Sequence, residues 1–164
     1  MQKTAYLSLG SNVGDRQANI AEAIRHLGGF GRVMAVSSLY ETEPVEVEVG
    51  QPWFLNCALT LETELMPAEL LRRVLEVERA MGRVRAGPKG PRTIDIDIVL
   101  FDNAVLDAPE LTIPHPAMQQ RRFVLEPLAE IAPEAKHPVL KRTVCELLAS
   151  LPHNGGIVRR FSGN

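Results

Sequence analysis

The chain has 164 residues, of which 45% are hydrophobic, and this fits one globular domain with a core of ordinary size. The formal net charge of −2 at pH 7 does not favour nucleic acid as a partner. Two cysteines are too few for a disulfide framework, so we expect reduced thiols in a cytoplasmic protein. The chain has neither a signal-peptide pattern at its start nor the roughly 20 consecutive apolar residues that span a bilayer.

Hydrophobic periodicity and turn residues predict alternating strands and helices in the first two thirds of the chain. Asn12 is the expected N-cap of the first helix, which ends at Gly28 and Gly29, and Pro67 opens the second. In chain order we expect a strand at 4–9, a helix, a strand at 33–41, a loop at 42–52, a strand at 53–62, a helix at 67–82, a loop at 83–92 and a strand at 93–101.

This order is the βαββαβ pattern of ferredoxin-like α+β folds, in which two helices pack on one face of an antiparallel sheet. Residues 102–164 are expected to add irregular structure and short helices near 116–121, 124–131 and 143–150. We expect residues 1–164 to form a single domain.

Side chains alternate between the two faces of a strand, so the third and fourth strands can be divided by period two. The apolar set must meet the helices: Leu55, Cys57, Leu59, Ile94, Ile96 and Ile98. The polar set is then expected on the opposite, more open face: Phe54, Asn56, Asp95 and Asp97.

Asp95 and Asp97 lie two residues apart on one face, with about 6.5–7 Å between their Cα atoms. Two carboxylates this close repel unless a cation lies between them, and their hard oxygens suit Mg²⁺ and a phosphoryl-transfer site. The glycine-rich loop at 83–92 carries four basic residues that could pair with a polyphosphate. We expect this loop to be a lid that closes when both substrates are bound. A solvated strand face and an ordinary charged turn are the alternatives.

The sequence has no P-loop motif, and LGSN at 9–12 is not a dinucleotide-binding G-x-G-x-x-G. Further along, His115 stands between two prolines and is followed by Arg121, Arg122 and Phe123. Taken singly, a loop histidine is more often simply exposed, and Phe54 and Phe123 could be plain core residues.

Taken together, five stretches resemble the hydroxymethyl-dihydropterin pyrophosphokinase family of the folate pathway. They are SLGSN, PWFLN, GRVR, GPRTIDIDIVLF and IPHPAMQQRRFVLEPLAEIAPE, and the resemblance extends from Tyr6 to about Leu151. It implies a ferredoxin-like fold and transfer of the diphosphate of ATP to the hydroxymethyl oxygen of the reduced pterin, which releases AMP.

The resemblance also implies roles for particular residues. Two Mg²⁺ ions would lie on the matched Asp95 and Asp97, which form the catalytic set together with Arg83 and Arg92. The ATP-side residues would be Arg85, Arg92, Thr112, His115 and Arg121. The pterin-side residues would be Thr42, Val45, Phe54, Asn56 and Phe123, with the two rings sandwiching the pterin.

The sequence departs from familiar members at four positions. Lys89 stands near the place of a loop tryptophan, Pro116 replaces a tyrosine, Glu110 an arginine, and Phe54 lacks the hydroxyl of a common tyrosine. We expect a monomer that binds two small molecules, with no nucleic acid and no membrane as partner. The competing hypotheses are a two-metal phosphodiesterase or nuclease, and a ferredoxin-like sensor or RNA-binding module.

Overall fold

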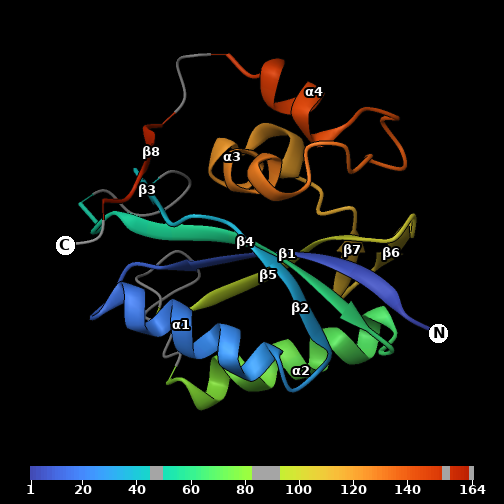
Figure 1. The fold of residues 1–164 in the computed structure, drawn as a ribbon, viewed down its shortest axis with the longest axis horizontal. Helices are drawn as coiled ribbons and strands as arrows, with labels where there is room; N and C mark the ends of the chain where they lie inside the picture. The colour runs from blue at the N-terminus through green and yellow to red at the C-terminus, as the bar shows by residue number, and fades with distance from the viewer. Residues whose placement is uncertain (45–49, 83–92, 153–155, 163–164) are drawn as a thin grey trace.

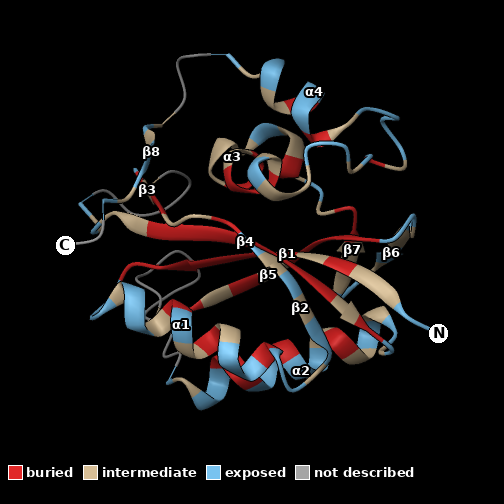
Figure 2. Ribbon diagram, viewed as in Figure 1, coloured by how far each residue is buried: buried red, intermediate tan, exposed pale blue. Residues whose placement is uncertain are grey.

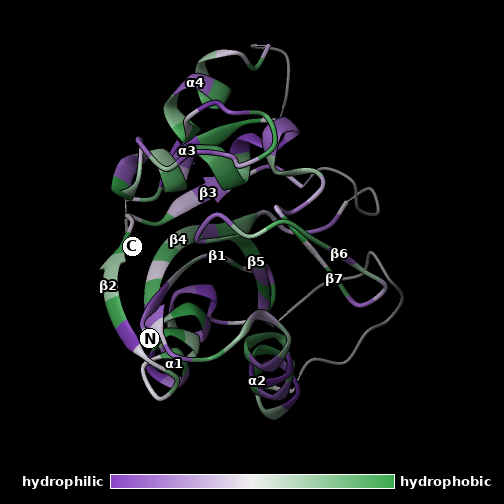
Figure 3. Ribbon diagram, turned by 90° about the vertical axis from the view of Figure 1, so that its right-hand side faces the viewer, coloured by the Kyte–Doolittle hydropathy of each residue, from purple (hydrophilic) through white to green (hydrophobic). Residues whose placement is uncertain are grey.

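The computed structural model describes residues 1–44, 50–82, 93–152 and 156–162. A central sheet is covered by helices on both faces (Figures 1 and 3). The elements that build its first layer are β1 (Lys3–Ser11), α1 (Arg16–Leu27), β2 (Arg32–Val36), β3 (Tyr40–Thr42), β4 (Phe54–Thr63), α2 (Pro67–Ala80) and β5 (Asp95–Phe101).

The main sheet is antiparallel at every pairing, with the order β5-β1-β4-β3-β8 and with β2 also paired to β4. β4 lies between β1 and β2, and β1 lies between β4 and β5. α1 therefore connects β1 and β2, which are separated by β4, and α2 connects β4 and β5, which are separated by β1. This is the split β-α-β arrangement of a ferredoxin-like fold. The predicted fold class is confirmed.

The helix-covered face of the sheet forms the larger hydrophobic core. The six apolar side chains predicted for this face are all buried there, against Ile20, Ala23 and Leu27 of α1 and Leu70, Val74 and Val77 of α2. Figure 2 shows the buried residues in the strands and on the sides of α1 and α2 that face them. Period two in the strands and the helical period in α1 and α2 thus assign this layer correctly.

The predicted strand at 33–41 is two strands, β2 and β3, because the ladder with β4 is interrupted at Ser37. The backbone N–H of Ser37 donates to the carbonyl oxygen of Ala58, at 2.9 Å. The N–H of Ala58, however, donates to the Ser37 hydroxyl oxygen, also at 2.9 Å, and not to a backbone carbonyl. A side chain replaces a main-chain partner at this point, as in a bulge, and the register moves by one residue between Val36 and Tyr40.

The predicted start of α1 is wrong by three residues. Asp15 is the N-cap, and its side chain accepts a hydrogen bond from the N–H of Ala18 at 3.1 Å. Asn12 is buried instead, and its amide donates to Gln51 Oε1 at 3.0 Å and to the carbonyl oxygen of Pro52 at 3.2 Å. Both residues are good caps, and the tertiary contact of Asn12 with the segment just before β4 decides between them.

The C-terminal third contains more regular structure than the sequence predicts. Its elements are β6 (Leu106–Ala108), β7 (Leu111–Ile113), the 3₁₀ helix η1 (Met118–Gln120), α3 (Arg122–Ile131), α4 (Val144–Ala149) and β8 (Val158–Arg160). The short helices were expected close to these places, whereas the β6–β7 hairpin and β8 were not. β8 pairs with β3, a partner more than a hundred residues away, so local pattern could not reveal it.

α3 and α4 cover the second face of the sheet, above the strands in Figure 1. They form a separate cluster with Ala58 of β4 and with Val99 and Leu100 of β5. The face that was expected to be open is therefore open only at the end that carries Phe54, Asp95 and Asp97, which are partly buried. Among the helices of the described ranges, none is both long enough and apolar enough to cross a bilayer.

Candidate active site

A row of residues crosses the sheet on the face that carries α3 and α4; its β5 end is partly exposed and its β3 end is buried. Asp95 of β5 is opposite Gly10 of β1, Gly10 is opposite Asn56 of β4, and Asn56 is opposite Tyr40 of β3. Residues opposite each other on antiparallel strands have side chains on the same face. We call these four residues the polar row; Asp97 and its partner Ser8 lie one step along, on the same face.

Gly10 makes room for its neighbours in the polar row. A Cβ atom at this position would lie 2.9 Å from Nδ2 of Asn56 and 3.5 Å from Cδ1 of Phe54. The Asn56 amide and the Phe54 ring therefore both lie over the backbone of β1 at Gly10. The sequence analysis did not assign Gly10 a role; its signal is a glycine inside a strand, which often marks a close approach.

Asn56 is held in one orientation from the side of β3. It is 5% exposed, Thr42 is 2% exposed, and the Thr42 hydroxyl donates to Oδ1 of Asn56 at 2.9 Å. This bond places Oδ1 towards β3 and Nδ2 over Gly10. Asn56 lies on the face that the sequence predicts, but it is buried there, and the buried hydroxyl partner fixes the direction of its amide.

Glu78 lies behind the aspartate pair, on α2. It is 3% exposed, and its Oε2 accepts a hydrogen bond of 2.7 Å from the backbone N–H of Ile96, the residue between Asp95 and Asp97. The helical period of the sequence places Glu78 on the apolar side of α2 but gives it no function. In the structure its carboxylate fixes the backbone of β5 between the two aspartates.

The aspartate pair itself offers carboxylate oxygens on one partly exposed face. Within the part of the chain that the structure describes, no third His, Cys, Asp or Glu joins a metal-binding group. Two carboxylates suit Mg²⁺, which takes few protein ligands and completes its octahedron with water and phosphate. The donor set therefore fits the ion that the sequence predicts.

β7 brings His115 alongside β5. Its backbone N–H donates to the carbonyl oxygen of Val99 at 2.9 Å, two residues beyond Asp97. Its Nδ1 accepts from the N–H of Ala117 at 3.2 Å, so the neutral ring carries its proton on Nε2 and can donate there. Thr112 lies in β7, just before a cis peptide bond between Ile113 and Pro114.

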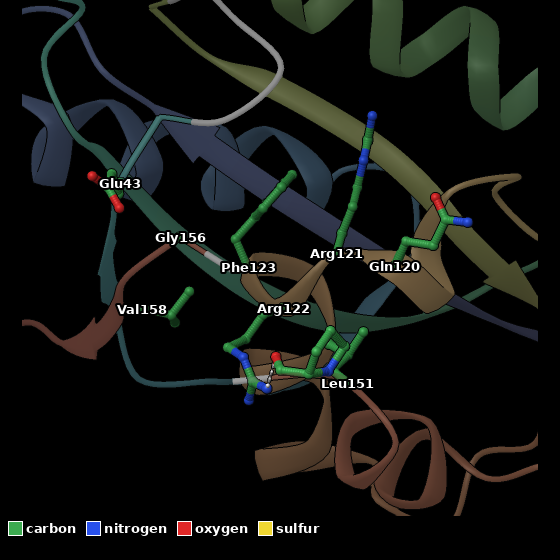
Figure 4. Close-up of a pocket in the computed structure, with 9 residues that line it drawn as sticks. Glu43, Gln120, Arg121, Arg122, Phe123, Leu151, Gly156 and Val158 are labelled. Atoms are coloured by element: carbon green, nitrogen blue, oxygen red, sulfur yellow. Dashed lines mark hydrogen bonds between the residues drawn. The ribbon is translucent and has the colours of Figure 1, made fainter. Parts of the chain in front are cut away.

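Arg121 and Phe123 lie at the start of α3 and point the same way, whereas Arg122 points to the opposite side (Figure 4). The Arg121 guanidinium lies 5.5 Å from the centre of the Phe123 ring, in a cation–π contact. Beside them is a cavity of about 240 Å³ lined by Glu43, Gln120, Arg121, Arg122, Phe123, Leu151, Pro152, Gly156 and Val158. Phe123 is partly buried: it packs against the second core cluster and also lines this cavity.

Tyr40 of β3 is the last residue of the polar row, and its hydroxyl contacts α3. Its hydroxyl donates to Oε1 of Glu130 at 2.6 Å, and both the N–H and the hydroxyl of Ser38 donate to Oε2 of Glu130 at 3.0 Å. Burial, and then the hydrogen bond to Glu130, raise the pKa of Tyr40. Burial opposes ionisation of Glu130, but the hydrogen bonds from Tyr40 and Ser38 outweigh it and lower its pKa. These groups therefore tie α3 to the strands.

The structure thus brings together most of the predicted site residues. Thr42, Phe54, Asn56, Asp95 and Asp97 lie on one face, with His115 beside β5 and with Arg121 and Phe123 at the start of α3. Pro116 and Glu110, two of the departures noted above, are exposed. The predictions for Val45, Arg83, Arg85, Lys89 and Arg92 concern residues outside the described ranges.

Fold and site together define a class: an α+β protein with a candidate small-molecule site at the partly exposed end of an antiparallel sheet. The family of 7,8-dihydro-6-hydroxymethylpterin-pyrophosphokinases (HPPK) matches residues 6–133. The chain belongs to this family.

The chain resembles relatives of similar length and also one segment of a much longer relative. It is 45% identical to the 2-amino-4-hydroxy-6-hydroxymethyldihydropteridine pyrophosphokinase of Methylorubrum extorquens over 92% of this chain and 95% of that one. It is 44% identical to the Bacillus subtilis protein of the same name, over 83% and 82%. It is also 44% identical to the folic acid synthesis protein fol1 of Schizosaccharomyces pombe, over 98% of this chain but only 22% of fol1.

The fold also resembles solved structures. A crystal structure of Plasmodium falciparum wild-type HPPK-DHPS with pteroate gives a TM-score of 0.74 at 18% identity, over 91% of this chain and 44% of that chain. At this level of identity the likeness concerns the fold.

Proposed function

We propose that the polar row is where the chain transfers the diphosphate group of ATP to the hydroxymethyl oxygen of 6-hydroxymethyl-7,8-dihydropterin, giving the pterin diphosphate and AMP. Membership of the family makes the chain a pyrophosphokinase of folate synthesis with ATP as co-substrate. The observation that carries the placement is the register Asp95–Gly10–Asn56, which sets carboxylates for phosphate chemistry next to an amide and a ring.

The pterin contacts in this proposal are Phe54, Asn56, Thr42 and Phe123, with Val45 added by family likeness. A flat heteroaromatic ring needs stacking surfaces on its faces and a few polar partners at its edge. Phe54 is partly exposed beside the buried amide of Asn56, whose direction Thr42 fixes. An amide held in this way presents one fixed donor to the pterin edge, so an isostere with the opposite polarity is disfavoured.

Asp95 and Asp97 are the proposed ligands of two Mg²⁺ ions. Ions held there would supply positive charge against the triphosphate and so help to orient it for transfer. The protein's part is to fix the carboxylates on a strand whose backbone is bonded to the buried Glu78. The hydroxymethyl oxygen bonds to the β-phosphorus as the bond to the AMP oxygen breaks, and the hydroxyl proton passes to Asp97 or to solvent. No covalent intermediate forms on the protein, so the rest of the catalysis is positioning and charge stabilisation.

The ATP-side residues in this proposal are Thr112, His115 and Arg121 among the described ones, together with Arg83, Arg85 and Arg92 from the sequence. His115 can donate from Nε2, and arginine forks match phosphate oxygens in pairs. In this proposal the protein works as a monomer in the cytoplasm and does not bind nucleic acid. The exposed free thiol of Cys145 suits a reducing compartment.

The direct test is AMP release from ATP and Mg²⁺ with and without 6-hydroxymethyl-7,8-dihydropterin. We expect AMP only when the pterin is present, in a one-to-one ratio with the pterin diphosphate. Cleavage of single-stranded DNA or RNA under the same conditions would instead support the phosphodiesterase alternative. Hydrolysis of ATP at the same rate without pterin would contradict the proposed acceptor.

A further inference from the structure

Arg16 lies on the helix side of the sheet, away from the polar row. It is the first residue of α1, and its partner Glu41 stands between Tyr40 and Thr42 in β3. Neighbouring residues of a strand point to opposite faces, so Glu41 faces away from the polar row. Figure 1 shows the start of α1 at the same end of the molecule as β3 and β8.

The Arg16 guanidinium joins three separate segments of the chain. Its Nη2 lies 3.2 Å from Oε2 of Glu41, and its Nη1 donates to the carbonyl oxygen of Trp53 at 3.0 Å. Its Cζ lies 5.8 Å from the centre of the Phe161 ring. The Arg16 and Glu41 side chains are only 24% and 23% exposed, so solvent screens the ion pair less than it screens a surface pair.

The partners of Arg16 are the sequence neighbours of two proposed pterin contacts. Glu41 precedes Thr42, Trp53 precedes Phe54, and Thr42 is opposite Phe54 in the β3–β4 register. One planar group therefore holds both strands from behind at the step where they present Thr42 and Phe54. The two Nη groups of an arginine can contact the Glu41 carboxylate and the Trp53 carbonyl oxygen at the same time, whereas a lysine has a single ammonium for both acceptors.

The C-terminal segment braces the same contact. Oε1 of Glu41 accepts from Nη2 of Arg159 at 3.2 Å, and the Arg159 guanidinium lies 4.9 Å from the centre of the Trp53 ring. Arg159 belongs to β8, which pairs with β3. Glu41 is thus held between two arginines from distant parts of the chain, and both arginines also contact Trp53.

We propose that Arg16 is a positioning residue for the pterin: it sets the spacing of Thr42 and Phe54 through Glu41 and Trp53 without touching either substrate. The inference rests on the proposed function, because it takes Thr42 and Phe54 as pterin contacts. Removing the fork loosens two strands on the pterin side and leaves the aspartates on β5 and His115 unchanged. Pterin affinity should therefore fall while nucleotide affinity does not.

The test uses the whole chain and calorimetry with two ligands, a non-hydrolysable ATP analogue and 6-hydroxymethylpterin added to the nucleotide complex. For Arg16→Ala we expect the pterin Kd to rise about tenfold, in keeping with the loss of hydrogen bonds to a charged group. The nucleotide Kd should stay within about twofold. Arg16→Lys should lie between wild type and Arg16→Ala.

Arg73→Ala is the matched control, because Arg73 also places its guanidinium over an aromatic ring, 5.7 Å from that of Phe30, but on α2. It should change neither Kd. Phe54→Ala separates the two proposals: an unchanged pterin Kd in Phe54→Ala would reject the proposed pterin site itself. A raised pterin Kd in Phe54→Ala beside an unchanged one in Arg16→Ala would reject only the role of Arg16.

Equal losses of pterin and nucleotide affinity in Arg16→Ala would also overturn the inference, because they would indicate general loosening of the fold. If Arg16→Ala does not fold, as judged by its circular dichroism, Arg16→Lys carries the test. A rise of about threefold or more in the pterin Kd alone supports the inference, and a wild-type pterin Kd overturns it.

Discussion

At the scale of single residues, the site depends on how neighbouring strands place a few polar groups. Asp95 and Asp97 are where period two puts them, since alternation is a property of any extended backbone. That Gly10 stands between Asp95 and Asn56 depends on the register of three strands, which no local pattern contains. The sequence therefore identifies the carboxylates but not the glycine that completes their surroundings.

Removing either carboxylate should stop turnover without unfolding the protein. For Asp95→Ala and Asp97→Ala we expect kcat to fall by roughly 10²-fold or more at saturating Mg²⁺, because a preorganised charge is lost from the phosphate site. The apo proteins should unfold at the wild-type urea midpoint or slightly above it, since repulsion between the carboxylates is relieved. Near wild-type activity in either variant would contradict the two-metal hypothesis.

A methyl group at position 10 should obstruct the pterin side of the site. In Gly10→Ala the new Cβ would lie 2.9 Å from Nδ2 of Asn56, whose amide Thr42 already holds in place. We expect the pterin KM to rise about tenfold while the ATP KM changes much less. Gly28→Ala, where the nearest atom to a new Cβ is a carbonyl oxygen at 3.4 Å, serves as the control and should have wild-type kinetics.

At the scale of elements, the second strand shows how a side chain can divide a predicted segment. Residues 33–41 have the composition of a single strand, yet Ser37 ends β2 by taking the N–H of Ala58 with its hydroxyl. The result is a shift of one residue that sets Tyr40 and Thr42 opposite Asn56 and Phe54. This break depends on the contact between Ser37 and Ala58, which are about twenty residues apart, so the β-propensity of residues 33–41 does not reveal it.

Ser37→Ala should therefore destabilise the sheet at this break. It leaves a buried backbone N–H without its acceptor, which costs about 1–3 kcal/mol. Urea unfolding followed by circular dichroism would measure this as a lower midpoint with an unchanged slope. Ser162→Ala, at an exposed position, should leave the midpoint unaltered, and an equal effect of both substitutions would contradict the role given to the Ser37 hydroxyl.

At the scale of the whole molecule, the C-terminal third turns an exposed sheet face into a second core and leaves the site at its edge. His137 organises the connection between α3 and α4. It is 6% exposed, and its Nδ1 accepts from the N–H groups of Val139 and Leu140 at 3.2 and 3.0 Å. Burial lowers its pKa from 6.5, and protonation would remove the acceptor on which both bonds depend.

This geometry predicts a loss of stability in mild acid. Because the folded pKa is below the unfolded value of 6.5, the unfolded state binds the proton more readily. The contribution of His137 is fully present above about pH 6.5 and is lost as the pH falls through the lowered pKa. The free energy of unfolding, measured in urea at about pH 5.5 and about pH 7.5, should differ less in His137→Asn than in wild type. An identical difference would contradict this account.

The sequence by itself determined the features that depend on periodic patterns within a short stretch of chain. Alternation in β4 and β5, the helical period of α1 and α2 and the order of the elements define the first core and the face of the aspartates. A specific motif around Asp95 and Asp97 then indicates the family. These features follow from backbone geometry that neighbouring residues share, so they can be inferred without knowing what lies opposite.

Only the tertiary structure decided which distant groups meet. The register of β1 sets Gly10 beside Asp95 and Asn56, β8 pairs with β3, and α3 and α4 cover part of the second face. Arg16 likewise contacts Glu41, in the middle of β3, and Trp53, just before β4, two segments that are distant from it in the sequence. The physical reason is that pairing energy depends on the packing of whole elements against one another, and no window of the sequence contains both partners.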